Sequence, residues 1–294
     1  MNLDLALATA VAGIVSGAYY ALLGLAIALI YRTTAVANFA QGELGTLSTF
    51  LFVLYVSRLP MPPLLQLIVS VAIAAGISSF AYLTLLRSQR GGDALNLTVR
   101  TLALYTLIHA VTLYIWGANE PYSATSLFAT GRIDVAGFKL AYDQMGTLVI
   151  AGCLGLSLFV LFRFTRVGLA MRSVAMNAEV ASLLGIDVSR IALVVWLIAG
   201  AIGALVAMLI APVSFLGTDL MQPYILKAFT AAVLGGLTSF PGVVVGGLLL
   251  GLIESFGSTW VSIHLREPFT FAILLLVLLF RPEGLFGRQH IGRV

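Results

Sequence analysis

Ionisable side chains inside long apolar stretches are the residues of this sequence whose types can do chemistry. A charged group in such a stretch is costly, so each is by default a candidate for a transport path, a proton relay or a buried ion pair. Carboxylates there bind cations, an imidazole exchanges protons near neutral pH, and an ammonium group attracts anions. The groups of this kind are Glu43, His109, Lys227 and Glu254.

Glu43 follows two amide side chains, Asn38 and Gln41, at the start of an apolar run. One interpretation is that these three residues line a translocation path or cap a broken helix beside it. The other is that Glu43 stays hydrated near the lipid headgroups or pairs with Arg32. Both interpretations stay open.

The other ionisable groups have structural interpretations that compete with functional ones. His109 stands near the middle of its run, which favours a hydrogen bond across helices over a role as ligand or relay. Glu254 is within two turns of Trp260, which favours anchoring at the membrane interface. Lys227 has the same alternative, but at an outward-facing helix start it could also attract a substrate carboxylate, helped by the helix dipole.

Motifs for hydrolytic chemistry are absent from the sequence. There is no Gly-x-x-x-x-Gly-Lys-Ser/Thr phosphate loop, so the chain is predicted not to hydrolyse ATP itself. No His-Glu-x-x-His or Gly-x-Ser-x-Gly motif occurs, and the single Cys153 cannot form an intrachain disulfide. We therefore predict no catalytic residues, no metal and no cofactor.

The composition predicts that the chain is a membrane protein. Of its 294 residues, 60% are hydrophobic and 10% are charged, and the mean hydropathy is +1.05. Soluble domains carry about 25% charged residues, so a soluble fold of this composition would lack a polar surface. The net charge of +4 comes from basic residues between apolar runs, which needs no nucleic-acid partner.

Nine apolar runs are candidates for membrane-spanning helices, which need about 20 residues. The run 222–240 is shortened by Gln222, Pro223 and Lys227, so it either spans or forms a half-helix. After it, Pro241-Gly242 indicates a tight turn between antiparallel helices rather than a broken helix at a substrate site. The runs are 5–31, 38–57, 63–86, 97–117, 143–164, 191–211, 222–240, 241–259 and 267–281.

Basic residues in the short loops predict the orientation. With the N-terminus outside, eleven Arg residues face the cytoplasm and five Lys or Arg residues face outward. We therefore predict N-out and C-in, which requires 222–240 to cross completely. The inward set is Arg32, Arg87, Arg90, Arg100, Arg163, Arg166, Arg172, Arg190, Arg281, Arg288 and Arg293, and the outward set is Arg58, Arg132, Lys139, Lys227 and Arg266.

Glycines four residues apart predict close helix packing, because small residues let two backbones approach. The pattern indicates a packed bundle and identifies no function. Its members are Gly13 and Gly17, Gly242 and Gly246, and Gly247 and Gly251. In the outward loop near 118–142, the alternation Ile133-Asp134-Val135 between Gly131 and Gly137 predicts a small hairpin.

The inward loop 165–190 carries the most informative pattern. Asn177 predicts an N-cap, Glu179 suits a first helical turn, and Gly185 suits the position after the end of a helix of about seven residues. A helix this short is not stable alone in water. Its apolar stripe therefore predicts something to pack against, either a groove on a soluble partner or the bilayer interface and the chain's own helices. The stripe is Val174, Ala178, Ala181 and Leu184 or Leu183.

This loop resembles the cytoplasmic signature of ABC importer permeases, in which a short coupling helix docks onto an ATPase. Glu179-Val-Ala181 followed by Gly185 carries that resemblance. Gly168-Leu-Ala-Met-Arg172 and Leu183-Leu-Gly-Ile186 are similar in particular to branched-chain amino-acid permeases of the LivH type. Further stretches agree in order along the chain, namely Ala37-Asn-Phe-Ala-Gln-Gly-Glu43, Lys227-Ala-Phe, Leu234–Gly242 and Leu279–Gly287.

The sequence departs from that family at three places. Gln41 stands where the family commonly has His, Glu283 where a second basic residue is frequent, and Val180 where the signature has Ala. The Gln41 departure leaves the cargo open, because relatives import urea, short amides and aromatic compounds as well as branched-chain amino acids.

The apolar runs predict an all-α polytopic helix bundle of eight to nine spans, N-out and C-in. The resemblance implies one permease domain over 1–294, with 165–190 as its cytoplasmic coupling loop, in the bacterial inner membrane. Its implied partners are cytoplasmic ATP-binding subunits, a second permease subunit and an extracytoplasmic solute-binding protein. The implied ATPase-coupling residues are Arg172, Asn177, Glu179, Ala181 and Gly185, and the path candidates from the apolar runs are Asn38, Gln41, Glu43 and Lys227.

Two other classes stay open. A secondary transporter would use internal repeats, midplane charges and an ion gradient in place of ATP. A membrane-embedded enzyme would need a catalytic cluster, whereas His109, His264 and His290 fall in different regions of the sequence.

Overall fold

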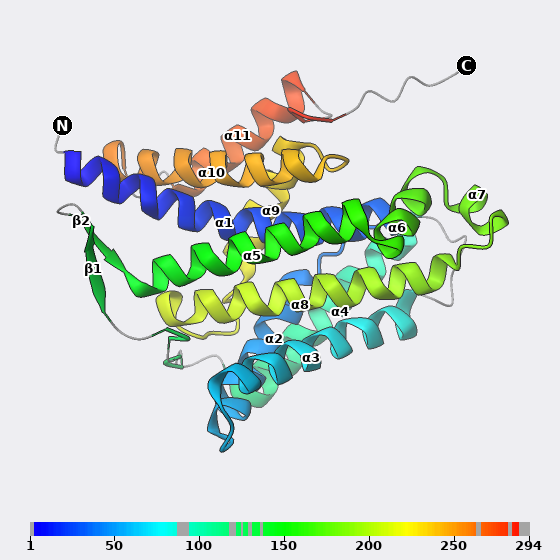
Figure 1. Ribbon diagram of the computed structural model, residues 1–294, viewed down its shortest axis with the longest axis horizontal. Helices are drawn as coiled ribbons and strands as arrows, with labels where there is room; N and C mark the ends of the chain where they lie inside the picture. The colour runs from blue at the N-terminus through cyan, green and yellow to red at the C-terminus, as the bar shows by residue number, and fades with distance from the viewer. Residues whose placement is uncertain are drawn as a thin grey trace. The chain divides into compact units, whose positions relative to one another are not determined.

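The protein is predominantly helical (Figure 1). Its chain forms two compact units. Unit 1 comprises 1–28, 128–152 and 224–294, and unit 2 comprises 29–127 and 153–223. The computed structural model describes residues 3–86, 94–117, 122–124, 126–128, 131–135, 138–262, 266–281 and 284–287. Residues named above that lie outside these ranges are Arg87, Arg90, Gly137, His264, Glu283, Arg288, His290 and Arg293.

Unit 1 is built on the long helix α1, most of which belongs to it, and on the C-terminal helices. The predicted hairpin is confirmed: β1 and β2 pair antiparallel, with Ile133 opposite Leu140. The elements of unit 1 are α1 (Leu3–Thr34), β1 (Arg132–Val135), β2 (Phe138–Ala141), the start of α5 (Tyr142–Phe164), α9 (Gln222–Gly235), α10 (Phe240–Trp260) and α11 (Arg266–Phe280).

A seam of glycines joins α1 and α10, which run antiparallel. A Cβ placed on Gly17 would lie 2.8 Å from the Leu248 Cα, and one on Gly247 would lie 2.5 Å from the Ala21 backbone nitrogen. Gly13 and Gly251 meet backbone atoms of the facing helix in the same way. Backbones in such contact gain dispersion energy and leave no room for side chains. The predicted role of these glycines in packing is confirmed.

We expect Gly251→Val to destabilise unit 1, because the new Cβ would overlap the backbone of Gly13 and Gly17. Forced repacking of this kind costs about 1–3 kcal/mol or more. The matched control is Gly152→Val on α5, where an added Cβ meets nothing within 4 Å. Thermal unfolding of the two purified variants in detergent measures the difference, and equal midpoints would contradict the packing role.

The connection from α9 to α10 differs from the sequence-based prediction. The turn lies before Pro241-Gly242, at Gly236, whose φ of +93° only glycine adopts easily. Ser239 caps α10 by accepting a hydrogen bond from the Gly242 N–H, so Pro241 sits in the first helical turn, where its missing N–H does no harm. The prediction of antiparallel helices was right, and the placement of the turn at Pro241-Gly242 was wrong.

The C-terminal motif packs back onto this turn. The Leu285 N–H donates to the Leu234 carbonyl at 2.8 Å, and the Phe286 N–H donates to that of Gly235 at 3.2 Å. These bonds satisfy carbonyls that the end of α9 leaves without intrahelical partners. Two stretches that the sequence comparison singled out separately, 234–242 and 279–287, therefore form one structural feature.

Unit 2 is organised around α8, against which α2 and α3 pack. Ser78 on α3 donates to the Trp196 carbonyl at 2.7 Å, beside Gly200, and Gly45 on α2 lies against Gly203. Further along, Phe52, Val56, Ala74, Ala204 and Met208 form a buried apolar cluster. The elements of unit 2 are α2 (Gln41–Leu54), the 3-10 turn Val56–Arg58, α3 (Pro63–Ala81), the π-helical turn Tyr82–Leu86, α4 (Ala94–Trp116), the end of α5, α6 (Arg166–Met176), α7 (Ala178–Leu183) and α8 (Val188–Ser214).

Six helices of the described residues are long and apolar enough to cross a membrane: α1, α3, α4, α5, α8 and α10. The runs predicted at 38–57, 222–240 and 267–281 do form helices, but α2, α9 and α11 have 14, 14 and 15 residues. A straight crossing needs about 20 residues, so these three fall short by length alone.

Candidate functional site

The first break in the helices lies between α1 and α2. Ala35 there has a φ of +54°, a conformation that residues with a side chain rarely adopt. Asn38 then accepts a hydrogen bond from the Ala40 N–H at 3.1 Å and donates to the Gln41 side chain at 3.2 Å. Gln41 in turn donates to the Ala199 carbonyl on α8 at 2.7 Å. The two amides, both fully buried, thus fix where α2 begins.

The second break lies between α8 and α9. Phe215 has a φ of +59°, and Leu216 forms a two-way backbone bridge with Tyr122, at 2.8 and 2.9 Å. In the turn that follows, the Gln222 N–H donates to the Asp219 carbonyl at 3.1 Å. This turn leaves the Asp219 side chain 67% exposed.

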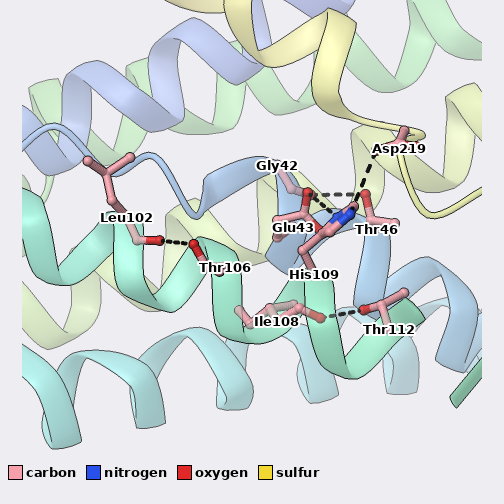
Figure 2. A network of polar contacts seen from close by, with 9 residues as sticks. All are labelled: Gly42, Glu43, Thr46, Leu102, Thr106, Ile108, His109, Thr112 and Asp219. Carbon is pink, nitrogen blue, oxygen red and sulfur yellow. Dashed lines mark hydrogen bonds and ion pairs between the residues drawn. The ribbon is translucent and has the colours of Figure 1, made fainter. Parts of the chain in front are cut away.

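The two breaks supply the carboxylates of one polar cluster, with His109 of α4 between them (Figure 2). The His109 Nδ1 lies 3.4 Å from Glu43 Oε1, and Nε2 lies 4.0 Å from Asp219 Oδ1. The Tyr105 ring stacks on the imidazole, with 6.0 Å between the ring centroids. We call Glu43, His109 and Asp219 the junction cluster. The basic side chain that lies near Glu43 is therefore His109 rather than Arg32.

A second polar cluster belongs to unit 1 and joins three helices. Lys227 Nζ lies 2.6 Å from Glu254 Oε1, and the Tyr20 hydroxyl donates to Glu254 Oε2 at 2.7 Å. Glu254 is 2% exposed and Lys227 8%. The prediction that Glu254 anchors at the interface was wrong, because its carboxylate is buried in an ion pair. The carboxylate that Lys227 meets in this structure belongs to Glu254.

The loop 165–190 has the capped short helix that its sequence predicts. Asn177 accepts from the Val180 N–H at 2.9 Å, and Gly185 ends α7 with a φ of +85°. Ala181 is buried against the neighbouring helices, whereas Arg172 and Glu179 are exposed. The predicted apolar stripe holds only in part: Val174 is buried with Ala181, but Ala178 and Leu184 face outward.

The structure brings some of the sequence-predicted residues together and separates others. Asn38, Gln41 and Glu43 lie together at the start of α2 in unit 2, and Lys227 belongs to unit 1. Sequence reasoning missed Asp219, which is a polar residue in a short connection and carries no distinguishing local signal. It also missed Tyr20, although a hydroxyl in the middle of an apolar helix indicates a polar partner. The part of the chain that the structure describes holds no group of three or more ligands arranged for a metal ion.

These features define a multi-pass membrane protein, with apolar helices long enough to span and ionisable groups held between them. Residues 9–279 match the family described as "Branched-chain amino acid transport system / permease component", and the chain belongs to that family. Its members are transport permeases of the inner membrane, which is where the chain resides.

The relatives agree with this assignment, and a solved structure has a similar fold. The chain is 30% identical to the high-affinity branched-chain amino acid transport system permease protein BraD of Pseudomonas aeruginosa, over 96% of each chain. It is 29% identical to LivH of Escherichia coli, again over 96% of each chain. In fold it is similar to PsaBC from Streptococcus pneumoniae in complex with Fab, with a TM-score of 0.50 and 10% identity over 92% of this chain and 91% of the other.

Proposed function

We propose that this chain is the permease subunit of an ABC importer that moves branched-chain amino acids into the cell. The observation that carries this proposal is the family match over 9–279, together with relatives named for that cargo across 96% of their length. The chain has no nucleotide-binding motif of its own, so a separate ATPase supplies the energy. In this proposal the chain is not an enzyme.

The proposed topology has eight to nine spans, with the N-terminus outside and the C-terminus in the cytoplasm. The excess of Arg residues in the inward loops supports the orientation. In this arrangement the short helices α2, α9 and α11 cross together with the irregular backbone beside them, which is tolerated where protein surrounds it. Both units together make one permease domain.

The proposed coupling element is the loop 165–190, and α7 is the part of it that binds an ATPase subunit. Met176, Leu183 and Leu184 are 87%, 82% and 76% exposed, so the tip of this loop presents apolar side chains. An apolar tip on a short helix suits a groove on a soluble partner. Movement of the ATPase would reach α6 and α8 through α7, which contacts both helices and has Ala181 buried. Arg172, Asn177, Glu179 and Gly185 are the other coupling residues of the proposal.

The proposed translocation path involves the start of α2. Glu43 belongs to the junction cluster, while Asn38 and Gln41 fix the start of the helix that carries it. Lys227 stays in the proposal as a path candidate whose charge Glu254 balances in this conformation. The remaining partners are a second permease subunit and an extracytoplasmic solute-binding protein that delivers the cargo.

Reconstitution tests the proposed function. The chain is purified with the ATPase, permease and binding-protein subunits encoded beside it and placed in proteoliposomes. We expect uptake of radiolabelled L-leucine only when ATP is inside and binding protein outside. Uptake driven by an ion gradient without ATP would identify a secondary transporter instead. Uptake of urea, a short amide or an aromatic compound in place of leucine would reassign the cargo within the family.

A further inference from the structure

Two carboxylates are buried in the described part of the chain, and their surroundings differ. Glu254 has one oxygen on Lys227 and the other on the Tyr20 hydroxyl. Glu43 is equally buried, with a side chain 3% exposed, but its Oε2 has no hydrogen-bond partner. Buried polar atoms without a partner are rare, because each loses its water and gains nothing in return. Both oxygens of Glu254 therefore have hydrogen-bond partners, whereas one oxygen of Glu43 has none.

The charge around Glu43 is also unbalanced. Among the described residues, the only basic group within 4 Å of Glu43 or Asp219 is His109, which both carboxylates share. With both carboxylates ionised, a protonated imidazole leaves one negative charge over and a neutral imidazole leaves two, and the charge on Asp219 is exposed to water. An uncompensated charge in a low-dielectric region attracts a cation strongly.

The imidazole has its own unmet hydrogen bond. Its Nδ1 is buried and unpartnered, although it lies 3.4 Å from Glu43 Oε1. With the proton on Nε2, toward Asp219, Nδ1 is an acceptor that faces a second acceptor. Two facing acceptors need a donor to complete them, and the described side chains provide none.

The cluster lies where two long helices are interrupted. Each break follows a long helix, of 32 and 27 residues, and precedes one of 14 residues. Ala35 and Phe215, at the two breaks, are the non-glycine residues of the described chain with positive φ. Short, interrupted segments in matching positions of two halves mark substrate sites in other transporters. Figure 2 shows Glu43 and Asp219 converging on His109 from these two junctions.

We propose that the junction cluster is a binding site for the primary ammonium group of the amino-acid cargo. A primary ammonium has three N–H donors and one positive charge. The acceptors are Glu43 Oε2, His109 Nδ1 and the exposed Asp219 carboxylate, which receives the ammonium first. This inference rests on the proposed function, because it takes an amino acid as the cargo.

The proposal is tested by measuring how leucine binds to the permease–ATPase complex when the solute-binding protein is absent. The permease–ATPase complex is placed in nanodiscs, and [³H]leucine binding is measured by scintillation proximity in the absence of binding protein. We expect Glu43→Gln to weaken binding at least about tenfold, since it removes a charge-assisted hydrogen bond. 3-Methylbutan-1-amine, which has the ammonium but no carboxylate, should displace leucine, and 4-methylpentanoate should not.

Two further variants separate recognition from folding. Asp219→Asn changes an exposed group and so leaves the fold intact, yet it should weaken leucine binding in the same direction. The matched control on α4 is Thr106→Val, whose hydroxyl bonds only the Leu102 carbonyl of its own helix, and it should bind leucine normally. Glu43→Gln should also elute as a monodisperse complex with the ATPase subunits in size-exclusion chromatography, which a merely misfolded variant would not.

The outcomes for the site and for the function are distinct. If the wild-type complex transports leucine and Glu43→Gln and Asp219→Asn bind it equally well, the ammonium site is wrong and the importer assignment stands. Equal displacement by the amine and the acid, or no leucine binding to a complex that transports it, would also overturn the site. If the wild-type complex transports no leucine, the proposed cargo itself is wrong.

Discussion

Lys227→Met is expected to lower the free energy of unfolding by about 3–5 kcal/mol, because it leaves the Glu254 carboxylate buried without its cation. Methionine has nearly the length of lysine, so the variant leaves little cavity and tests the charge. The Tyr20 hydroxyl remains as a donor, but a neutral hydrogen bond does not balance the full charge of a buried carboxylate. Glu254→Gln should be destabilising for the reciprocal reason, since it leaves an uncompensated ammonium.

The double variant Lys227→Met/Glu254→Gln should recover most of that loss. Replacing both members of a buried ion pair by neutral groups of similar volume is often close to neutral, whereas removing one member is not. Thermal and denaturant unfolding of the purified proteins in detergent measures all three. The control is Arg190→Gln, which breaks an exposed ion pair with Asp187 and should change stability by less than about 1 kcal/mol. Single variants as stable as the wild type would show that the pair is not needed for the fold.

Gly185→Val is expected to abolish transport while the protein still inserts into the membrane. Gly185 ends α7 with a φ of +85°, and a side chain there costs about 1–2 kcal/mol of backbone strain, more for a β-branched one. An added Cβ would meet nothing within 4 Å, so the effect comes from the backbone alone. The short helix would then end elsewhere and change what it presents to the ATPase. Gly185→Asn is the control, because asparagine tolerates this conformation.

Glu179→Lys tests the same element through its surface. Glu179 is exposed in the first turn of α7, where its charge contributes about 0.3–1 kcal/mol through the helix dipole. Because this contribution is small, the substitution should leave the fold intact. A loss of uptake would then indicate that the ATPase no longer docks on α7. ATP-dependent uptake and co-purification of the ATPase measure the effect for both variants. Normal uptake by Gly185→Val and Glu179→Lys would contradict the coupling role of this loop.

Features set by local chemistry could be predicted from the sequence. The cap at Asn177 and the left-handed stop at Gly185 depend on a few neighbouring residues, and both were predicted correctly. The hairpin of β1 and β2 and the glycine packing of α10 likewise follow from short patterns. The turn before α10 was predicted at the wrong residues. Pro241-Gly242 is compatible both with a turn and with the first turn of a helix, and only the cap at Ser239 distinguishes the two.

Features that depend on a distant partner could not be predicted. Glu254 is 27 residues from Lys227 and 234 from Tyr20, so nothing near it in the sequence distinguishes a buried ion pair from an interfacial anchor. Asp219 could not be singled out either, because its carboxylate comes close to His109 of α4 only when the chain folds. Asn38, Gln41 and Glu43 could be singled out because they stand close together in the sequence, although the contact of Gln41 with α8 could not be predicted. Their place in a translocation path stays a prediction.

The backbone contact between α1 and α10 limits how this protein can change shape. Helices joined through leucines can slide or tilt past one another, because side chains change rotamer as they move. Gly13, Gly17, Gly247 and Gly251 have no side chains to rearrange, so any tilt would drive one main chain into the other. We therefore expect α1 and α10 to keep their contact during the transport cycle, and the conformational change to take place at other helix contacts.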